Sequence, residues 1–325
     1  MATSTLNIEP MVLVHGGAGY ISDNAIPGMH CGVRSAARIG YKTLNKTGCV
    51  LEAVQEAVSS METDPNFNAG YGSALTCDGT VEMDAAIMHG ATLEAGCVSC
   101  AQDINHPIVL ARRIMMQTPH KFMAGEGAMN FAVEHGFPLH PEGTLVTYNA
   151  FNALQNFKKN LHSSGNFEEL TASSLYREFG EPSAVGAVAI DSYGNVAAAT
   201  STGGITGKMR GCISNSAILG GGIYADNVAG AVSATGDSEI LMRYNAASRI
   251  LAQIEEANIP AQQATEKVLS DIMQRFNKTT GAICIDRNGT IGIYFTSPHM
   301  SWAYQRAHEL HFGIVPGEDQ VKIVE

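Results

Sequence analysis

Residues 183–204, SAVGAVAIDSYGNVAAATSTGG, form the stretch that most limits what this chain can fold into. It consists almost wholly of small and apolar residues around Ser192–Asn195, whose composition is typical of a tight turn. On either side of the turn, apolar residues at every second position alternate with small partners, as expected of strands: Val185, Ala187, Ala189, Val196 and Ala198. Small side chains on both faces suit a hairpin against which other backbone packs closely. The stretch therefore predicts a hairpin in the core, buried on both faces.

Length and charge limit the classes of protein. The chain has 325 residues, of which 45% are apolar and 16% charged, enough for one large domain or two. Its net charge of −11 argues against binding to nucleic acid, because no basic stripe would neutralise phosphates. Met1–Pro10 lacks the pattern of a secretory leader, and no apolar run is long enough to span a membrane. We expect a soluble cytoplasmic protein without a membrane or nucleic-acid partner.

The cysteines point to the same compartment. Seven are scattered along the chain, and the single CxxC, Cys97 and Cys100, has no second pair to complete a zinc site. An odd, dispersed set is typical of reduced thiols in a cytosolic protein.

The N-terminal part reads as a strand, two helices and a loop. Met11–His15 is a short apolar strand followed by a glycine-rich loop, Gly16–Gly19. A strand entering such a loop can hold a phosphate, but no helix follows directly and the nucleotide-binding spacings are absent. Met29–Asn45 and Leu51–Met61 have helical periodicity. The next stretch, 62–73, has the composition of a loop, where Glu62 and Asp64 would be solvated charges.

Six short strings carry a resemblance to a known family. They are VHGGAG at 14–19, DPNFNAGYGS at 64–73, EMDAAIM at 82–88, VGAVAID at 185–191, TSTGG at 200–204 and YADN at 224–227. Over residues 11–150 and 184–315 the chain resembles the plant-type L-asparaginases and isoaspartyl peptidases, a branch of the N-terminal-nucleophile hydrolases. The resemblance implies an α+β fold, a four-layer αββα sandwich, in a single domain over 1–325. Within it, 1–157 would correspond to the α-subunit, 158–183 to the linker and 184–325 to the β-subunit.

The position of the family's nucleophile is occupied by alanine. In the resembled enzymes a threonine precedes the VGAVA string, cleaves the chain ahead of itself and then attacks the substrate. Here Ala184 stands there, and its methyl group can do neither. The resemblance implies that Thr202, Thr235 and Asn68 are the remaining catalytic positions.

The substrate-binding positions also depart from the family. Where the resembled enzymes place an arginine for the substrate's carboxylate and an aspartate for its amine, this chain has Cys212 and Asn215. Arg210, two residues upstream of Cys212, is the alternative cation. Thr235 and Gly236 correspond to the family's oxyanion hole, but Asp237 and Ser238 stand where the family has a His-Gly pair. Without that glycine the backbone beside the hole has fewer allowed conformations, and Asp237 adds a carboxylate near the place where negative charge would develop. We expect an asparagine or β-aspartyl ligand to bind at most weakly.

Two further expectations rest on the resemblance alone. Main-chain carbonyls in the 61–69 segment would hold a structural sodium ion: Met61, Glu62, Phe67 and Ala69. No other cofactor is implied, and the family's habit predicts a homodimer.

Three hypotheses about function remain open. The first is an active hydrolase with Ser183 as nucleophile after a one-residue shift, although such a shift would turn the hydroxyl to the opposite face. The second is an enzyme trapped by a single Thr→Ala change at the 183/184 junction, which leaves Cys212 and Asn215 unexplained. The third is an uncleaved pseudoenzyme with a binding or structural role. The joint loss of nucleophile and both charged clamps favours the third hypothesis.

Overall fold

The structure is a computed structural model that describes residues 8–163 and 184–324. The helices are α1 (Ile26–Thr47), α2 (Val50–Thr63), α3 (Pro107–Gln117), α4 (Gly125–Glu134), α5 (Tyr148–Ser163), α7 (Ser238–Tyr244), α8 (Ala246–Glu255) and α9 (Ala261–Phe276), with short 3-10 turns η1 (Gly70–Gly72) and η2 (Asn215–Ala217). The strands are β1 (Met11–Gly19), β2 (Met83–His89), β3 (Ala95–Ala101), β4 (Phe122–Ala124), β5 (Val185–Ile190), β6 (Val196–Thr202), β7 (Ile223–Asp226), β8 (Gly230–Gly236), β9 (Thr280–Asp286), β10 (Ile291–Phe295), β11 (His299–Arg306), β12 (Glu309–Gly313) and β13 (Gln320–Ile323). No helix in these ranges is long and apolar enough to cross a bilayer.

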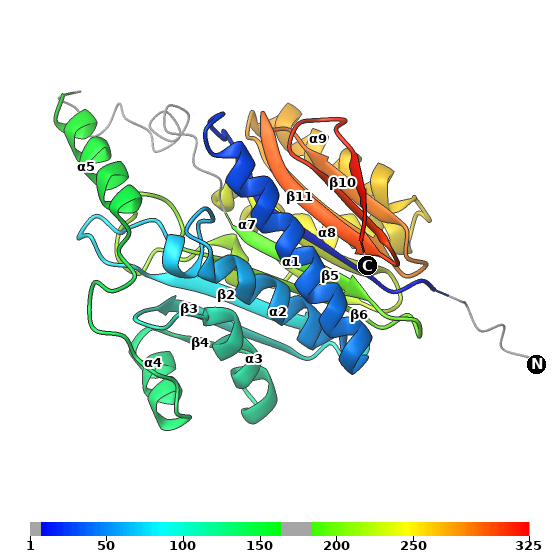
Figure 1. Ribbon diagram of the computed structural model, residues 1–325, viewed down its shortest axis with the longest axis horizontal. Helices are drawn as coiled ribbons and strands as arrows, with labels where there is room; N and C mark the ends of the chain where they lie inside the picture. Colours follow the sequence, from blue (N-terminus) through cyan, green and yellow to red (C-terminus); the bar gives the residue numbers. More distant parts are fainter. Residues whose placement is uncertain (1–7, 164–183, 325) are drawn as a thin grey trace, which may run out of the picture.

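The strands form two stacked sheets with helices outside both (Figure 1). The larger sheet has the order β13-β12-β11-β1-β5-β6-β2-β3-β4, and the smaller has the order β10-β9-β8-β7. One buried cluster joins α1–α3 to the large sheet, a second lies between the sheets, and a third joins the small sheet to α7–α9. These layers confirm the α+β, four-layer αββα sandwich.

The predicted hairpin is the centre of the large sheet. β5 pairs with β1 on one side and β6 on the other, and every residue of both hairpin strands is buried. The close backbone approach is visible at Gly186, where a Cβ would lie 2.0 Å from Ser233 Oγ of the second sheet. Small residues are therefore required here because the two sheets pack closely over the hairpin.

The structure corrects the prediction that Gly16–Gly19 is a loop. Gly16–Gly19 continues β1, with an irregular register between His15 and Ala18. A Cβ on Gly16 would lie 2.3 Å from the Phe67 ring, so glycine serves close packing in a strand there.

The helix boundaries differ in two places. α5 runs to Ser163, so residues 158–163 of the predicted linker are helical, because a partly exposed helix tolerates polar residues without clear periodicity. The remainder of that linker, 164–183, lies outside the described residues. Residues 238–255 have the apolar spacing of a single helix, but the helix breaks at Asn245, which has φ of 57° and ends α7 in a left-handed conformation.

Candidate active site

Ala184 lies at the junction of three strands. It immediately precedes β5 and is only 2% exposed. The Thr235 hydroxyl of β8 donates to the Ala184 carbonyl at 3.3 Å, and its oxygen accepts the Ala18 N–H of β1 at 3.2 Å. The structure thus brings Thr235 to the predicted nucleophile position, where the methyl of Ala184 offers no lone pair for attack.

A buried histidine–serine pair supports this junction. His15 Nε2 lies 2.7 Å from Ser233 Oγ, and both residues are fully buried. Burial lowers the pKa of His15 to about 3, although its contact with the Ala184 backbone acts in the opposite direction. His15 is therefore neutral near pH 7. Our sequence reasoning missed this pair; the signal was the alternation along β8, which puts Ser233 on the same face as Thr235.

Thr202 and Asn68 hold one turn together. Thr202 Oγ1 accepts the Gly204 N–H at 2.9 Å, and Asn68 Nδ2 donates to the Gly204 carbonyl at 2.7 Å. The main-chain carbonyl of Asn68 also accepts the Gly203 N–H at 3.0 Å. These two predicted catalytic positions, far apart in sequence, are brought to the same turn at the end of β6.

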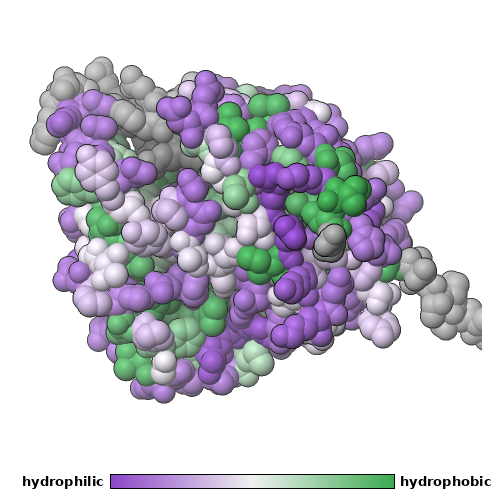
Figure 2. Space-filling model, in the orientation of Figure 1, coloured by the Kyte–Doolittle hydropathy of each residue, from purple (hydrophilic) through white to green (hydrophobic). Residues whose placement is uncertain are grey.

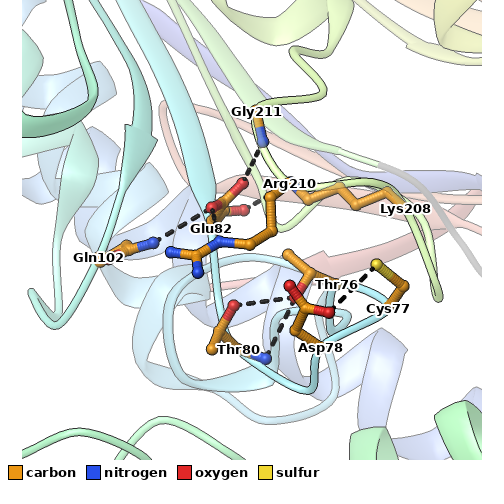
Figure 3. Close-up of polar contacts among 9 residues, drawn as sticks. All are labelled: Thr76, Cys77, Asp78, Thr80, Glu82, Gln102, Lys208, Arg210 and Gly211. Atoms are coloured by element: carbon orange, nitrogen blue, oxygen red, sulfur yellow. Dashed lines mark hydrogen bonds and ion pairs between the residues drawn. The ribbon is translucent and has the colours of Figure 1, made fainter.

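Glu82 fixes the segment that precedes the clamp positions. Its buried carboxylate accepts Gln102 Nε2 at 3.1 Å, Arg210 Nε at 3.4 Å and the Gly211 N–H at 2.8 Å (Figure 3). Lys208 Nζ donates to the Glu82 main-chain carbonyl at 2.7 Å. Arg210 is thus paired with Glu82, which argues against Arg210 as the cation that would bind a substrate carboxylate in place of the missing arginine.

Asp84 and Ser238 hold the backbone of the segment around Asn215, the second clamp position. Fully buried Asp84 accepts the Cys100 N–H at 3.1 Å and the Ser214 N–H at 2.7 Å, so it satisfies two backbone donors. Ser238 Oγ accepts the Asn215 N–H at 2.7 Å. Asn215 Nδ2 donates to the Ala234 carbonyl at 3.1 Å, a bond that needs an amide at this position.

The two clamp positions carry no full charge. Cys212 is half-buried, and burial, followed by the Glu239 carboxylate, raises the pKa of its thiol, which stays protonated near pH 7. Asn215 is a neutral amide. Neither residue supplies the charge that would pair with an α-carboxylate or an α-amine.

Asp237 is not an isolated charge beside the predicted oxyanion position, because its carboxylate has two partners. Its carboxylate accepts the Ile240 N–H at 3.0 Å as the N-cap of α7 and pairs with Lys278 Nζ at 2.8 Å. Its charge is therefore largely offset. Neighbouring Gly236 has φ of 116°, and a Cβ there would lie 2.6 Å from Thr280 Cα, so glycine is required.

The site offers little open space. Ala184, Thr202 and Thr235 are each at most 2% exposed. Two open cavities on the described chain, of about 1320 and 670 Å³, are lined by none of the predicted site residues.

Carbonyls of the predicted ion loop, which spans the end of α2, accept backbone hydrogen bonds. The carbonyls of Met61, Phe67 and Ala69 accept the N–H groups of Asp64, Ala69 and Gly72. A Cβ on Gly70 would lie 2.1 Å from the Glu62 carbonyl oxygen. Within the described ranges, no cluster of three or more His, Cys, Asp or Glu side chains suits a metal.

Glu62 itself corrects a prediction. Its side chain is fully buried, not solvated, and accepts the Ile108 N–H at 3.1 Å while His106 Nδ1 lies 3.2 Å away. Burial raises the pKa of Glu62, and its partners His106 and Ile108 oppose that shift. The carboxylate joins α2 to the start of α3.

Comparison with known proteins gives a consistent family. A family model described as Asparaginase matches residues 8–314. A protein of Drosophila pseudoobscura named as a probable isoaspartyl peptidase/L-asparaginase is 44% identical, over 94% of this chain and 96% of its own. Proteins of Danio rerio and Homo sapiens named isoaspartyl peptidase/L-asparaginase are each 41% identical, over 97% of this chain and 98% and 99% of theirs.

Proposed function

This chain belongs to the asparaginase family, and from that premise we propose that it is a member that neither cleaves itself nor hydrolyses amides. Its sandwich then serves a binding or structural role. The observation that carries this proposal is Ala184 at the head of β5, hydrogen-bonded through its carbonyl to the Thr235 hydroxyl. A nucleophilic hydrolase needs an oxygen or sulfur at the attacking position, and this residue has neither.

The surroundings of Ala184 support the same proposal. A change of the nucleophile alone would leave the substrate clamps in place, whereas here both clamp positions, Cys212 and Asn215, are neutral. Asn215 bonds the Ala234 carbonyl, and Arg210 bonds Glu82. Asparagine and β-aspartyl dipeptides should therefore bind weakly or not at all.

The test combines a gel with an assay. Purified protein should remain a single chain of 34.4 kDa on a denaturing gel after long incubation. The same sample should release no ammonia from asparagine and no aspartate from β-aspartyl dipeptides. Two shorter bands, or turnover that survives repurification, would refute the proposal.

An active or trapped hydrolase of L-asparagine and isoaspartyl peptides is the second candidate. It is favoured by the retained arrangement of Asn68, Thr202 and Thr235 and by the relatives' names. A parent enzyme with threonine at position 184 would cleave at the 183/184 junction, whereas a shifted nucleophile at Ser183 would cleave the bond before Ser183. N-terminal sequencing of any cleaved product separates the candidates, because Ser183 at the new terminus would identify the shifted nucleophile.

We also propose a structural sodium ion at the end of α2. Each carbonyl of Met61, Phe67 and Ala69 keeps a second lone pair beyond its backbone bond, and hard cations prefer oxygen ligands. Gly70 allows the Glu62 carbonyl to approach the same turn. The midpoint of thermal unfolding should be higher in sodium chloride than in choline chloride at equal ionic strength; equal midpoints would contradict the site.

Homodimerisation and a cytoplasmic location complete the proposal. All seven cysteines are free thiols, which favours a reducing compartment. Light scattering coupled to size exclusion should give twice the mass of the chain, and fractionation should leave the protein with soluble cytoplasmic markers.

A further inference from the structure

A basic groove lies between α1 and the C-terminal strands, apart from the candidate active site. Its volume is about 1320 Å³, and its walls come from α1, the end of β11, the start of β12 and β13. Among the described residues, one carboxylate lines it, that of Glu9, together with four cationic side chains: Arg34, Arg38, Lys42 and Lys322. The whole chain has a net charge of −11, so this local group of positive charges is opposite in sign to the charge of the protein.

The α1 cations are placed at a spacing that costs stability. Arg34, Arg38 and Lys42 follow one another four residues apart, and like charges at this spacing repel on a helix surface. Arg34 is anchored, since its Nε donates to the His30 carbonyl at 2.9 Å and its guanidinium lies 4.7 Å from the Phe312 ring centre. Over residues 8–163 and 184–324, no carboxylate pairs with exposed Arg38 or Lys42.

The opposite wall is an edge strand. β13 is the last strand of the large sheet, and all four of its residues are exposed. Lys322 pairs with Leu310, whose side chain belongs to the buried cluster under α1, so Lys322 lies on the α1 side of the sheet. Ile39 of α1 and Ile323 of β13, which also line the groove, are 38% and 75% exposed. In Figure 2 a hydrophobic patch adjoins strongly hydrophilic surface in this region.

We propose that the groove binds an extended acidic segment of a partner protein, which lies beside β13 with its carboxylates toward α1. Strand addition supplies main-chain hydrogen bonds at an unpaired edge, and side-chain complementarity supplies specificity. Carboxylates would relieve the repulsion among Arg34, Arg38 and Lys42. Nucleic acid and anionic membranes carry far more negative charge and would be repelled by the rest of this acidic chain.

The test uses a labelled peptide of alternating glutamate and valine, long enough to pair with β13, in fluorescence anisotropy. The full-length protein should bind it, more weakly as salt rises, and should not bind the alternating lysine–valine peptide. Arg38→Glu with Lys42→Glu should weaken binding at least about tenfold. Arg38→Gln with Lys42→Gln should also weaken it while unfolding no earlier than the parent, because the variant removes like-charge repulsion.

Arg243→Glu with Lys267→Glu is the matched control. Both residues are exposed on α7 and α9, and the pair changes the net charge by the same amount. Its peptide affinity should stay within about twofold of the parent, because surface charges farther away than a Debye length are screened. An equal loss in the control, no peptide binding at all, or binding only to RNA or phosphatidylserine vesicles would overturn the proposal. So would a groove variant that changes only the oligomeric mass, since the groove would then be an interface between copies.

Discussion

At the scale of single residues, restoring the nucleophile alone should not restore an enzyme. Ala184→Thr adds two heavy atoms at a position only 2% exposed, so it must repack around Thr235. It can nevertheless restore some chain cleavage, because that reaction uses the protein's own backbone and no amino-acid clamp. Hydrolysis of asparagine should stay negligible, since the lack of one charged partner typically costs about 2–5 kcal/mol and two are lacking.

Adding the clamps should therefore matter more than adding the nucleophile. The triple variant Ala184→Thr, Cys212→Arg and Asn215→Asp should exceed Ala184→Thr in kcat/KM for asparagine by at least about thirtyfold. Asn215→Asp loses the bond to Ala234, so its thermal midpoint must be measured alongside. Equal activity in the single and triple variants would mean that the clamp positions are misassigned.

The buried His15 predicts a pH dependence. Its pKa is about 3 in the folded chain and near its ordinary value of 6.5 in the unfolded chain, so between these values the unfolded state binds more protons. Folding stability therefore falls as pH falls through this window, by up to about 1.4 kcal/mol per pH unit. His15→Gln keeps a polar group for Ser233 and removes the titration. The stability advantage of the parent over this variant should shrink from pH 7 to pH 5 in denaturant titrations; a constant difference would contradict the assignment.

At the scale of elements, the break between α7 and α8 depends on one residue. Asn245 has φ of 57°, a conformation that asparagine and glycine adopt more readily than other residues. Asn245→Ala should destabilise the fold by about 1–2 kcal/mol, whereas Asn245→Gly should be closer to the parent. Denaturant midpoints of the two variants check this, and an alanine variant as stable as glycine would show that the backbone conformation is unimportant.

The same break shows where sequence reasoning ends. Ile240, Leu241 and Ala247 keep a helical apolar spacing across Asn245, so periodicity alone predicts one helix. The hairpin at 185–202 was predictable because small residues on both faces leave few other structures. Burial of Glu62 was not, because its partner His106 is 44 residues away and becomes visible only in the folded chain. In the candidate site, family resemblance supplied the prediction that Ala184 and Asn215 are site positions, whereas the hydrogen bonds of Glu82 to the 208–211 segment required the fold.

At the scale of the whole molecule, the large sheet interleaves the two halves of the chain. β1 from the N-terminal half lies between β11 and β5 of the C-terminal half, and β6 pairs with β2. Neither half therefore contains a sheet of its own around the hairpin. This arrangement favours the prediction of one domain over 1–325, with the linker joining parts that fold together.

Separately produced halves should consequently fail to fold. Residues 1–163 alone would leave both edges of β1 unpaired, with the fully buried side chains Val12 and Leu13 exposed, and 184–325 alone would leave β5 without β1. Each fragment should show little amide protection in hydrogen exchange, whereas co-expressed fragments should assemble into one soluble species that protects β1, β5 and β6 together. A 184–325 fragment that protects β5 and β6 by itself would mean that the halves are independent domains, and the interleaved sheet would then form by docking after each half had folded.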